Sequence, residues 1–270
     1  MADQKSDDPL SSSVFVIING TSDYCQEGFS VCAWSAHTGF SYIARQAPPN
    51  HKQTHLFIYM ALYFRKKLDN KAEIAVWQVT ETEEELKNIA SVPTDEMEDI
   101  MLFRSESQRR QKLAVRALLN EVFEEKMYLN HHDNGQPYLE NCVTNISITH
   151  TDKYVAIIIH DEEELGIDIE SLDRDFSAVE KKALSEDEID DLEKEKRNEQ
   201  LAIYWCAKEA IFKRMSQNRV DFAEQIEVEK FNVRKEGELE ATFIHKDEHE
   251  EDFELEYMIF DRHVLVWLVG

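Results

Sequence analysis

The segment Gly166-Ile167-Asp168-Ile169-Glu170 places the tightest constraint on the fold. Side chains alternate between the two faces of a β-strand, so Ile167 and Ile169 would point into a core while Asp168 and Glu170 share the opposite face. Two carboxylates on one face repel each other unless a cation lies between them, and Mg²⁺ prefers such oxygen ligands. The simpler alternative is an amphipathic strand whose acidic face lies in water. We predict a strand here, and the metal site needs support from other motifs.

Periodic patterns predict an α+β fold from about residue 73 onward. In residues 107–123, apolar residues recur with the 3.6-residue period of a helix that is buried on one face. A second helix is predicted over 199–214, and an acidic helical segment over 178–198. Apolar runs predict strands at 74–79, 145–149 and 154–160, and a closing antiparallel sheet over 226–269.

The first 59 residues differ in composition from the rest. They hold 5 acidic and 3 basic residues, whereas the remaining 211 hold 50 and 27. One β-like run, Val14–Ile18, and an ambiguous aromatic stretch over 56–63 show no pattern that would build a core. We predict a flexible extension over 1–59. Two alternatives stay open: Met60 is the natural start, or the segment is an accessory element.

Charge and cysteine content exclude several classes of protein. With 30 Lys and Arg against 55 Asp and Glu, the formal charge is −25, which disfavours general nucleic-acid binding and docking on anionic membranes. The four cysteines show neither a CxxC pair nor zinc-like spacing, as expected for reduced cytosolic thiols. No apolar run approaches the roughly 20 residues that span a bilayer, and no secretory signal is evident. We therefore expect a cytoplasmic protein.

Two further motifs could carry chemistry. In Trp205-Cys206-Ala207-Lys208-Glu209-Ala210-Ile211-Phe212-Lys213, a helix would place Glu209 and Lys213 on one face. Thr149-His150-Thr151 ends a predicted strand. A surface ion pair explains the first motif equally well, and a lone histidine near a turn is usually structural. Each motif alone is weak evidence.

Together and in this order, the three motifs resemble the 4′-phosphopantetheinyl transferase superfamily. The resemblance covers roughly 73–270 and is strongest in 135–213. Asn134-Gly135-Gln136-Pro137-Tyr138-Leu139 is similar to the family's Gly-Lys-Pro segment, with Gln136 replacing the usual lysine, and Thr149 stands where larger members usually carry serine. The larger, pseudo-dimeric members are the better match. They imply two similar α+β subdomains, over 60–163 and 164–270, with the active site in the cleft between them.

The resemblance also implies an activity. The family moves the 4′-phosphopantetheine arm of coenzyme A to a serine of an acyl or peptidyl carrier protein and releases 3′,5′-ADP. Asp168, Glu170 and Glu209 would hold Mg²⁺ or Mn²⁺. Glu209 would be the base for the incoming serine, and Lys213 would neutralise or protonate the leaving group. His150 would complete the catalytic set. The expected coenzyme A contacts are Arg110, Thr149, His150, Lys208 and Lys213.

The helix predicted over 107–123 would carry a stripe of basic residues. Arg109, Lys112 and Arg116 would share one face of the helix over 107–123, with Arg110 beside them, as a phosphate-binding patch or a solvated stripe.

A rival activity is another Mg²⁺-dependent phosphoryl or nucleotidyl transfer. A rival from another class is a non-catalytic module that binds coenzyme A or a carrier. We expect a monomer, with fatty-acid synthesis as one possible pathway.

Overall fold

The computed structural model describes residues 31–34, 41–44, 61–217 and 219–270. Within the first 59 residues it describes one antiparallel pair, β1 (Val31–Trp34) with β2 (Ser41–Ala44). The run Val14–Ile18 and residues 56–60 of the aromatic stretch lie outside the described residues. The expectation of flexibility over 1–59 therefore stays a prediction.

An antiparallel sheet of four strands forms the first half. Its order is β3 (Leu62–Lys67), β4 (Glu73–Gln78), β8 (Tyr154–His160) and β7 (Asn145–His150). A separate hairpin pairs β5 (Leu129–His131) with β6 (Pro137–Leu139). The predicted strands at 74–79, 145–149 and 154–160 are thereby confirmed within one or two residues.

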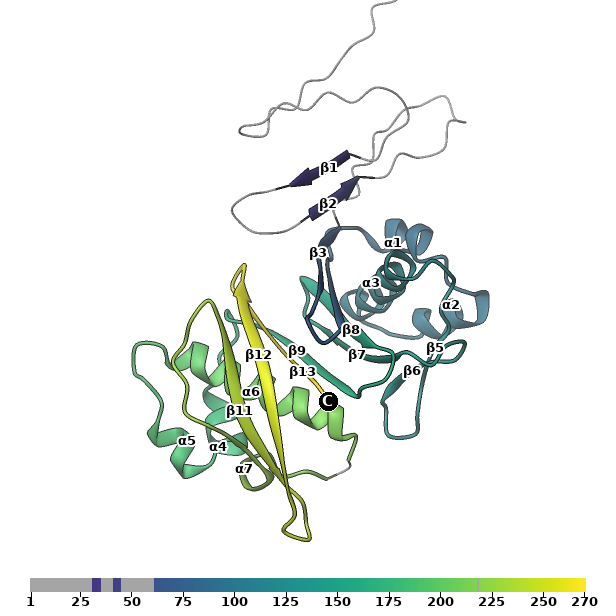
Figure 1. Cartoon of the computed structure of the whole chain (residues 1–270). Helices are drawn as coiled ribbons and strands as arrows, with labels where there is room; N and C mark the ends of the chain where they lie inside the picture. The colour runs from purple at the N-terminus through teal and green to yellow at the C-terminus, as the bar shows by residue number, and fades with distance from the viewer. Residues whose placement is uncertain (1–30, 35–40, 45–60, 218) are drawn as a thin grey trace, which may run out of the picture.

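Three helices cover one face of this sheet (Figure 1). They are α1 (Glu83–Ala90), α2 (Thr94–Met101) and α3 (Glu106–Val122). Helix α1 begins with a capping box in which Thr82 and Glu85 satisfy each other's backbone N–H groups. Helix α3 confirms the predicted helix over 107–123, and its apolar stripe packs on the sheet.

The second half is an antiparallel sheet of five strands with helices on its outer face. The strand order is β10 (Ile226–Val228), β11 (Glu236–Ile244), β12 (Glu250–Phe260), β13 (His263–Val269) and β9 (Leu165–Ser171). The helices are α4 (Ser177–Ala183), α5 (Glu186–Asp190), α6 (Arg197–Met215) and α7 (Phe222–Gln225). The acidic segment over 178–198 therefore forms two short helices and a turn, followed by the long helix α6.

The two sheets pack against each other, with helices outside on both sides (Figure 1). Ile167 and Ile169 are buried between the sheets with Ile74, Ile158 and Trp267. This confirms the predicted inward face of β9 and the α+β class. The opposite face of β9 lies under α6, so Asp168 is buried and the alternative of an acidic face in water is wrong.

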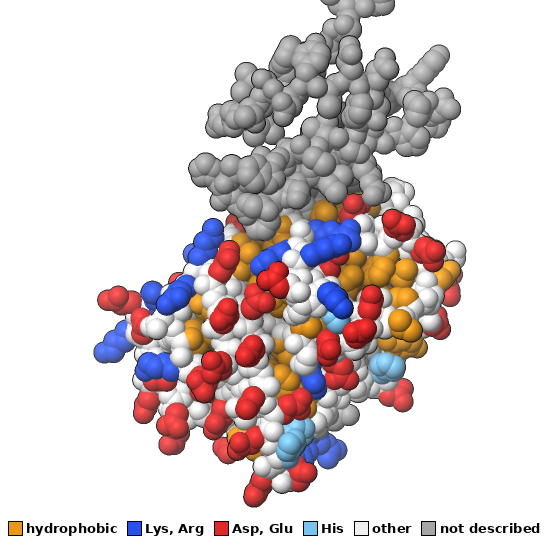
Figure 2. Space-filling model, viewed as in Figure 1, with side chains coloured by type: hydrophobic (Ala, Val, Ile, Leu, Met, Phe, Trp, Pro, Cys, Tyr) orange, Lys and Arg blue, Asp and Glu red, His pale blue; other side chains and the backbone are white. Residues whose placement is uncertain are grey.

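Charge is dispersed over one face of the molecule. Figure 2 shows carboxylates scattered across the visible face, with lysines and arginines between them. Within the described part of the chain, no helix combines the length and the apolar character that crossing a bilayer requires.

Candidate active site

Helix α6 lies unusually close to strand β9, and Gly166 makes this possible. A Cβ atom at residue 166 would lie 1.9 Å from the carbonyl oxygen of Ala210, far inside any permitted contact. The obstructing atom is helix backbone and cannot rotate away. The missing side chain therefore lets the helix face that carries Trp205, Glu209 and Lys213 lie along the acidic face of β9.

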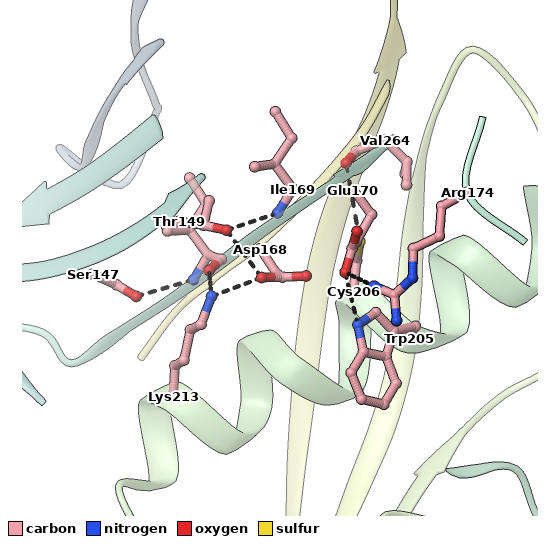
Figure 3. A network of polar contacts seen from close by, with 11 residues as sticks. Ser147, Thr149, Asp168, Ile169, Glu170, Arg174, Trp205, Cys206, Lys213 and Val264 are labelled. Atoms are coloured by element: carbon pink, nitrogen blue, oxygen red, sulfur yellow. Dashed lines mark hydrogen bonds and ion pairs between the residues drawn. The ribbon is translucent and has the colours of Figure 1, made fainter. Parts of the chain in front are cut away.

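Asp168 is held by two donors from different halves of the molecule (Figure 3). Its Oδ1 atom accepts from Lys213 Nζ at 2.7 Å and from Thr149 Oγ1 at 3.0 Å. Lys213 also donates to the carbonyl oxygen of Ile167 at 2.8 Å. The Oδ2 atom is buried and, the neighbouring Cys206 thiol aside, has no hydrogen-bond partner among the described residues. A buried carboxylate oxygen without a partner is costly unless something binds to it.

Glu170 lies two residues further along the same face. Its Oε1 atom accepts from Trp205 Nε1 at 3.0 Å and forms an ion pair with Arg174. The Arg174 guanidinium also lies over the rings of Phe176 and Trp205, at 4.9 and 5.8 Å from their centroids. Arg174 is thus a site residue that the sequence motifs missed. The only signal for it is a positive charge just after the acidic strand.

Glu209 has the most perturbed carboxyl group of the three. Burial raises its pKa to about 7, and the charges of Asp168 and Glu170 push in the same direction, while Lys213 opposes them. Burial and the charge of Asp168 also raise the pKa of Glu170. A carboxyl group with a pKa near neutrality can accept or donate a proton under ordinary conditions. The site therefore combines excess negative charge with a candidate base.

The three carboxylates suit a divalent cation, although their side chains are not arranged around one in this structure. As they lie, no three His, Cys, Asp or Glu residues within the described ranges are gathered closely enough to bind a metal ion. The unpartnered Oδ2 of Asp168 and the raised pKa values of Glu170 and Glu209 both fit a site that gains stability from a cation. Three carboxylates are the oxygen ligands that Mg²⁺ takes.

The two predicted site residues of β7, Thr149 and His150, differ in their exposure and contacts. Thr149 is buried, and its hydroxyl is engaged with Asp168 and with the backbone N–H of Ile169. His150 is exposed at the end of the strand, yet the protein atoms around its ring and the charges of Lys213 and Lys112 lower its pKa. A neutral imidazole can offer one donor and one acceptor at neutral pH.

Lys208 does not reach this cluster. It is fully buried on another face of α6, where its Nζ pairs with Glu188 at 2.7 Å and donates to the carbonyl oxygens of Phe222 and Ile226 at 2.9 and 2.6 Å. These three contacts use all the hydrogens of the ammonium group. The geometry gives no support to the expected coenzyme A contact, and we do not propose Lys208 for that role.

The expected basic stripe is largely occupied by internal contacts. Arg110 donates to the carbonyl oxygens of Glu81 and Val79, at 2.9 and 3.2 Å, and fixes the loop before α1. Arg109 pairs with Glu83, and Arg116 pairs with Glu96. Of these four residues, only Lys112 forms neither an ion pair nor a side-chain hydrogen bond with a described residue; its Nζ lies 4.6 Å from the centre of the Phe103 ring. Lys112 is the member whose charge reaches His150.

A pocket adjoins the cluster where the two halves meet. Its volume is about 190 Å³, and residues from the β5–β6 hairpin, β7, β9 and the end of α6 line it. Lys213 belongs to both the pocket wall and the carboxylate cluster. The hairpin turn is attached to the end of α6, because Asn134 Nδ2 donates to the carbonyl oxygen of Ser216 at 3.1 Å. Gln136, which stands where the resemblance leads one to expect lysine, lines the same pocket.

Part of the chain matches a known protein family. Residues 164–265 match the family model described as the 4′-phosphopantetheinyl transferase superfamily. The match includes Gly166–Glu170 and Trp205–Lys213 and leaves Arg110, Thr149 and His150 outside. A search of curated proteins found none that matches the chain.

Proposed function

Because residues 164–265 form a domain of the 4′-phosphopantetheinyl transferase superfamily, we propose that this protein moves the phosphopantetheine arm of coenzyme A to a carrier-protein serine. The family match itself supports phosphopantetheinyl transfer as the class of reaction and a transferase as the class of enzyme. The proposal adds the acceptor, an acyl or peptidyl carrier protein, and the product, 3′,5′-ADP. A carrier of fatty-acid synthesis is the first one to test.

One observation carries the proposal: Lys213 joins a cluster of three buried or half-buried carboxylates to a pocket between the halves. Asp168, Glu170 and Glu209 would hold Mg²⁺, or Mn²⁺ in its place. A cation bound there would offset charge on the pyrophosphate as a Lewis acid and template. The pocket offers the pantetheine arm and the pyrophosphate a place beside these carboxylates.

The chain's own residues then have distinct roles. Glu209, with its raised pKa, accepts the proton of the carrier serine directly or through one water. The serine oxygen forms a bond to the phosphorus of the pantetheine arm, and the anhydride bond to 3′,5′-ADP breaks. Lys213 lies beside Asp168 and offsets the charge that develops on the leaving group. His150, exposed at the end of β7, would contact the nucleotide phosphates.

We also propose the division into two similar subdomains, over 60–163 and 164–270. Its support is that each half has one antiparallel sheet covered by helices on its outer face, and that the pocket adjoins both sheets.

The free thiols of Cys142 and Cys206 support a reducing compartment, and we place the reaction in the cytoplasm. We propose that the protein acts there as a monomer.

Mass spectrometry of the carrier tests the activity. Apo-carrier incubated with this protein, coenzyme A and Mg²⁺ should gain the mass of one phosphopantetheine arm, and a chelator should prevent the gain. The matched control is Glu209→Gln, which keeps the side-chain shape but removes the base. Carrier that binds yet stays unmodified would favour the non-catalytic module. Turnover of a nucleotide without coenzyme A would favour the other transferases.

A further inference from the structure

The two sheets meet at their edge strands, β7 and β9, and side chains make the connection. Two backbone N–H groups of β9 donate to side-chain hydroxyls on β7 instead of to the carbonyl oxygens of a neighbouring strand. Ile167 N donates to Ser147 Oγ at 3.3 Å, and Ile169 N donates to Thr149 Oγ1 at 3.1 Å. Both hydroxyl residues are buried, with 4% and 5% of their surface exposed. The two residues are therefore equivalent in their contact with the edge of β9.

Thr149 differs from Ser147 in one respect that concerns the site. A hydroxyl that accepts a hydrogen bond can still donate its own proton, and Thr149 Oγ1 donates to Asp168 Oδ1 at 3.0 Å. The hydroxyl is thus anchored on one side by rigid strand backbone and holds the carboxylate on the other (Figure 3). Lys213 binds the same oxygen, so both donors converge on Oδ1 and leave Oδ2 unpartnered.

We propose that Thr149 is a positioning residue for Asp168 and not a contact of coenzyme A. By fixing Oδ1 from a buried backbone anchor, Thr149 holds the carboxylate in the one rotamer that presents Oδ2 to a divalent cation. This inference rests on the proposed function for the identity of the cation as Mg²⁺. It assigns residue 149 to the metal site, although the residue lies in the other half of the molecule and outside the family match.

Three variants separate positioning from other roles. Thr149→Val removes the hydroxyl, Thr149→Ser keeps it, and Ser147→Ala removes the equivalent hydroxyl that does not touch Asp168. Calorimetric titration of the full chain with Mg²⁺, without coenzyme A, should show affinity weakened about tenfold or more in Thr149→Val. Thr149→Ser and Ser147→Ala should stay within about threefold of the unmodified chain, well short of that loss. If Thr149→Val does not fold by circular dichroism, Thr149→Ala removes the same hydroxyl in a smaller side chain.

Steady-state kinetics supply a second readout. In Thr149→Val the Mg²⁺ concentration needed for half-maximal rate should rise, while the KM for coenzyme A at saturating Mg²⁺ stays unchanged. A raised KM for coenzyme A with unchanged Mg²⁺ affinity would overturn the proposal and make Thr149 a coenzyme A contact. Equal Mg²⁺ losses in Thr149→Val and Ser147→Ala would overturn it in favour of a purely structural junction.

The calorimetric result tests this inference independently of the proposed function. Absence of Mg²⁺ binding by the unmodified chain overturns the inference. If the unmodified chain binds Mg²⁺ and Thr149→Val binds it more weakly, the inference stands even when no carrier is modified. In that case only the proposed transfer reaction is contradicted.

Discussion

Helix α6 carries two lysine–carboxylate pairs with the same N–O distance and opposite surroundings. Lys208 and Glu188 approach to 2.7 Å, as do Lys213 and Asp168. In the first pair the carboxylate also accepts from the backbone N–H groups of Ser185 and Val228, and the lysine reaches two carbonyl oxygens. In the second pair one carboxylate oxygen lacks a described partner and the lysine side chain is 27% exposed.

The difference separates a structural ion pair from a reactive one. A pair whose every donor and acceptor is satisfied fixes the elements around it, here α5, α6, α7 and β10. A pair with an unused, buried acceptor and an accessible lysine retains capacity to bind a substrate or cation. Ion-pair distance alone would not have distinguished them.

Removing Asp168 should have the largest effect on activity. Asp168→Ala should lower the transfer rate about a thousandfold or more, since a cation ligand is lost, and Glu170→Ala or Glu209→Ala should act in the same direction. Thermal unfolding should change little, because Lys213 can reach water. The control is Glu254→Ala, which removes an exposed carboxylate on β12. A near-normal rate in Asp168→Ala at saturating coenzyme A would refute the metal assignment.

Breaking the buried pair should instead affect stability. Lys208→Met leaves the Glu188 carboxylate buried without its cation, and we expect a loss of about 3–5 kcal/mol in the free energy of unfolding. Denaturant titration measures it, and adding Glu188→Gln should recover part of the loss. A stable Lys208→Met protein with a raised KM for coenzyme A would show that Lys208 contacts the substrate after all.

Truncating Lys213 should lower turnover more than binding. We expect Lys213→Ala to reduce kcat about a hundredfold, because the charge on the leaving group is no longer offset, while the KM for the carrier changes little. Steady-state kinetics with varied carrier concentration separates the two. A raised carrier KM with normal kcat would place Lys213 on the docking surface.

Glu209 should make the site pH-dependent. Its pKa is raised to about 7 by burial, so the folded protein holds this proton at pH values where the unfolded chain releases it. This contribution to stability is fully present below the ordinary glutamate pKa, declines as pH rises from there, and is lost above about pH 7. Mg²⁺ affinity should rise over the same interval, because the ionised carboxylate is the ligand. Calorimetry across this range should show the rise, and Glu209→Gln should flatten it.

Removing residues 1–59 should have the smallest effect. The composition change near residue 60 and the cores formed by 61–270 lead us to expect an active, folded protein. Circular dichroism and the carrier assay test both properties. An insoluble or inactive product would show that the segment packs against the catalytic region.

The sequence predicted features that depend on local periodicity. The alternation around Ile167 and Ile169 and the stripe of α3 both appear as expected. Lys208 could also have been placed correctly, because it shares a helix face with the apolar residues Tyr204 and Ile211.

Contacts between distant elements were not predictable in this way. Arg110 reaches carbonyl oxygens in a loop about 30 residues away, and only the packing of α3 beside that loop decides it. Thr149 meets Asp168 because two sheet edges adjoin, which no spacing in one sequence encodes. Arg174 follows no motif, and its pairing with Glu170 depends on how the chain leaves β9.

Gly166 fixes the distance between α6 and β9, which the charged residues of the site do not control. A Cβ at Gly237 would meet a side chain, that of Tyr257, whereas one at Gly166 would meet the backbone carbonyl of a helix. Even the smallest added group at residue 166 must therefore push α6 outward as a rigid rod, carrying Glu209 and Lys213 away from β9 together. A saturation-mutagenesis map of this protein should show full intolerance at residue 166, and enzyme redesign should treat that glycine as the spacer that sets the depth of the active site.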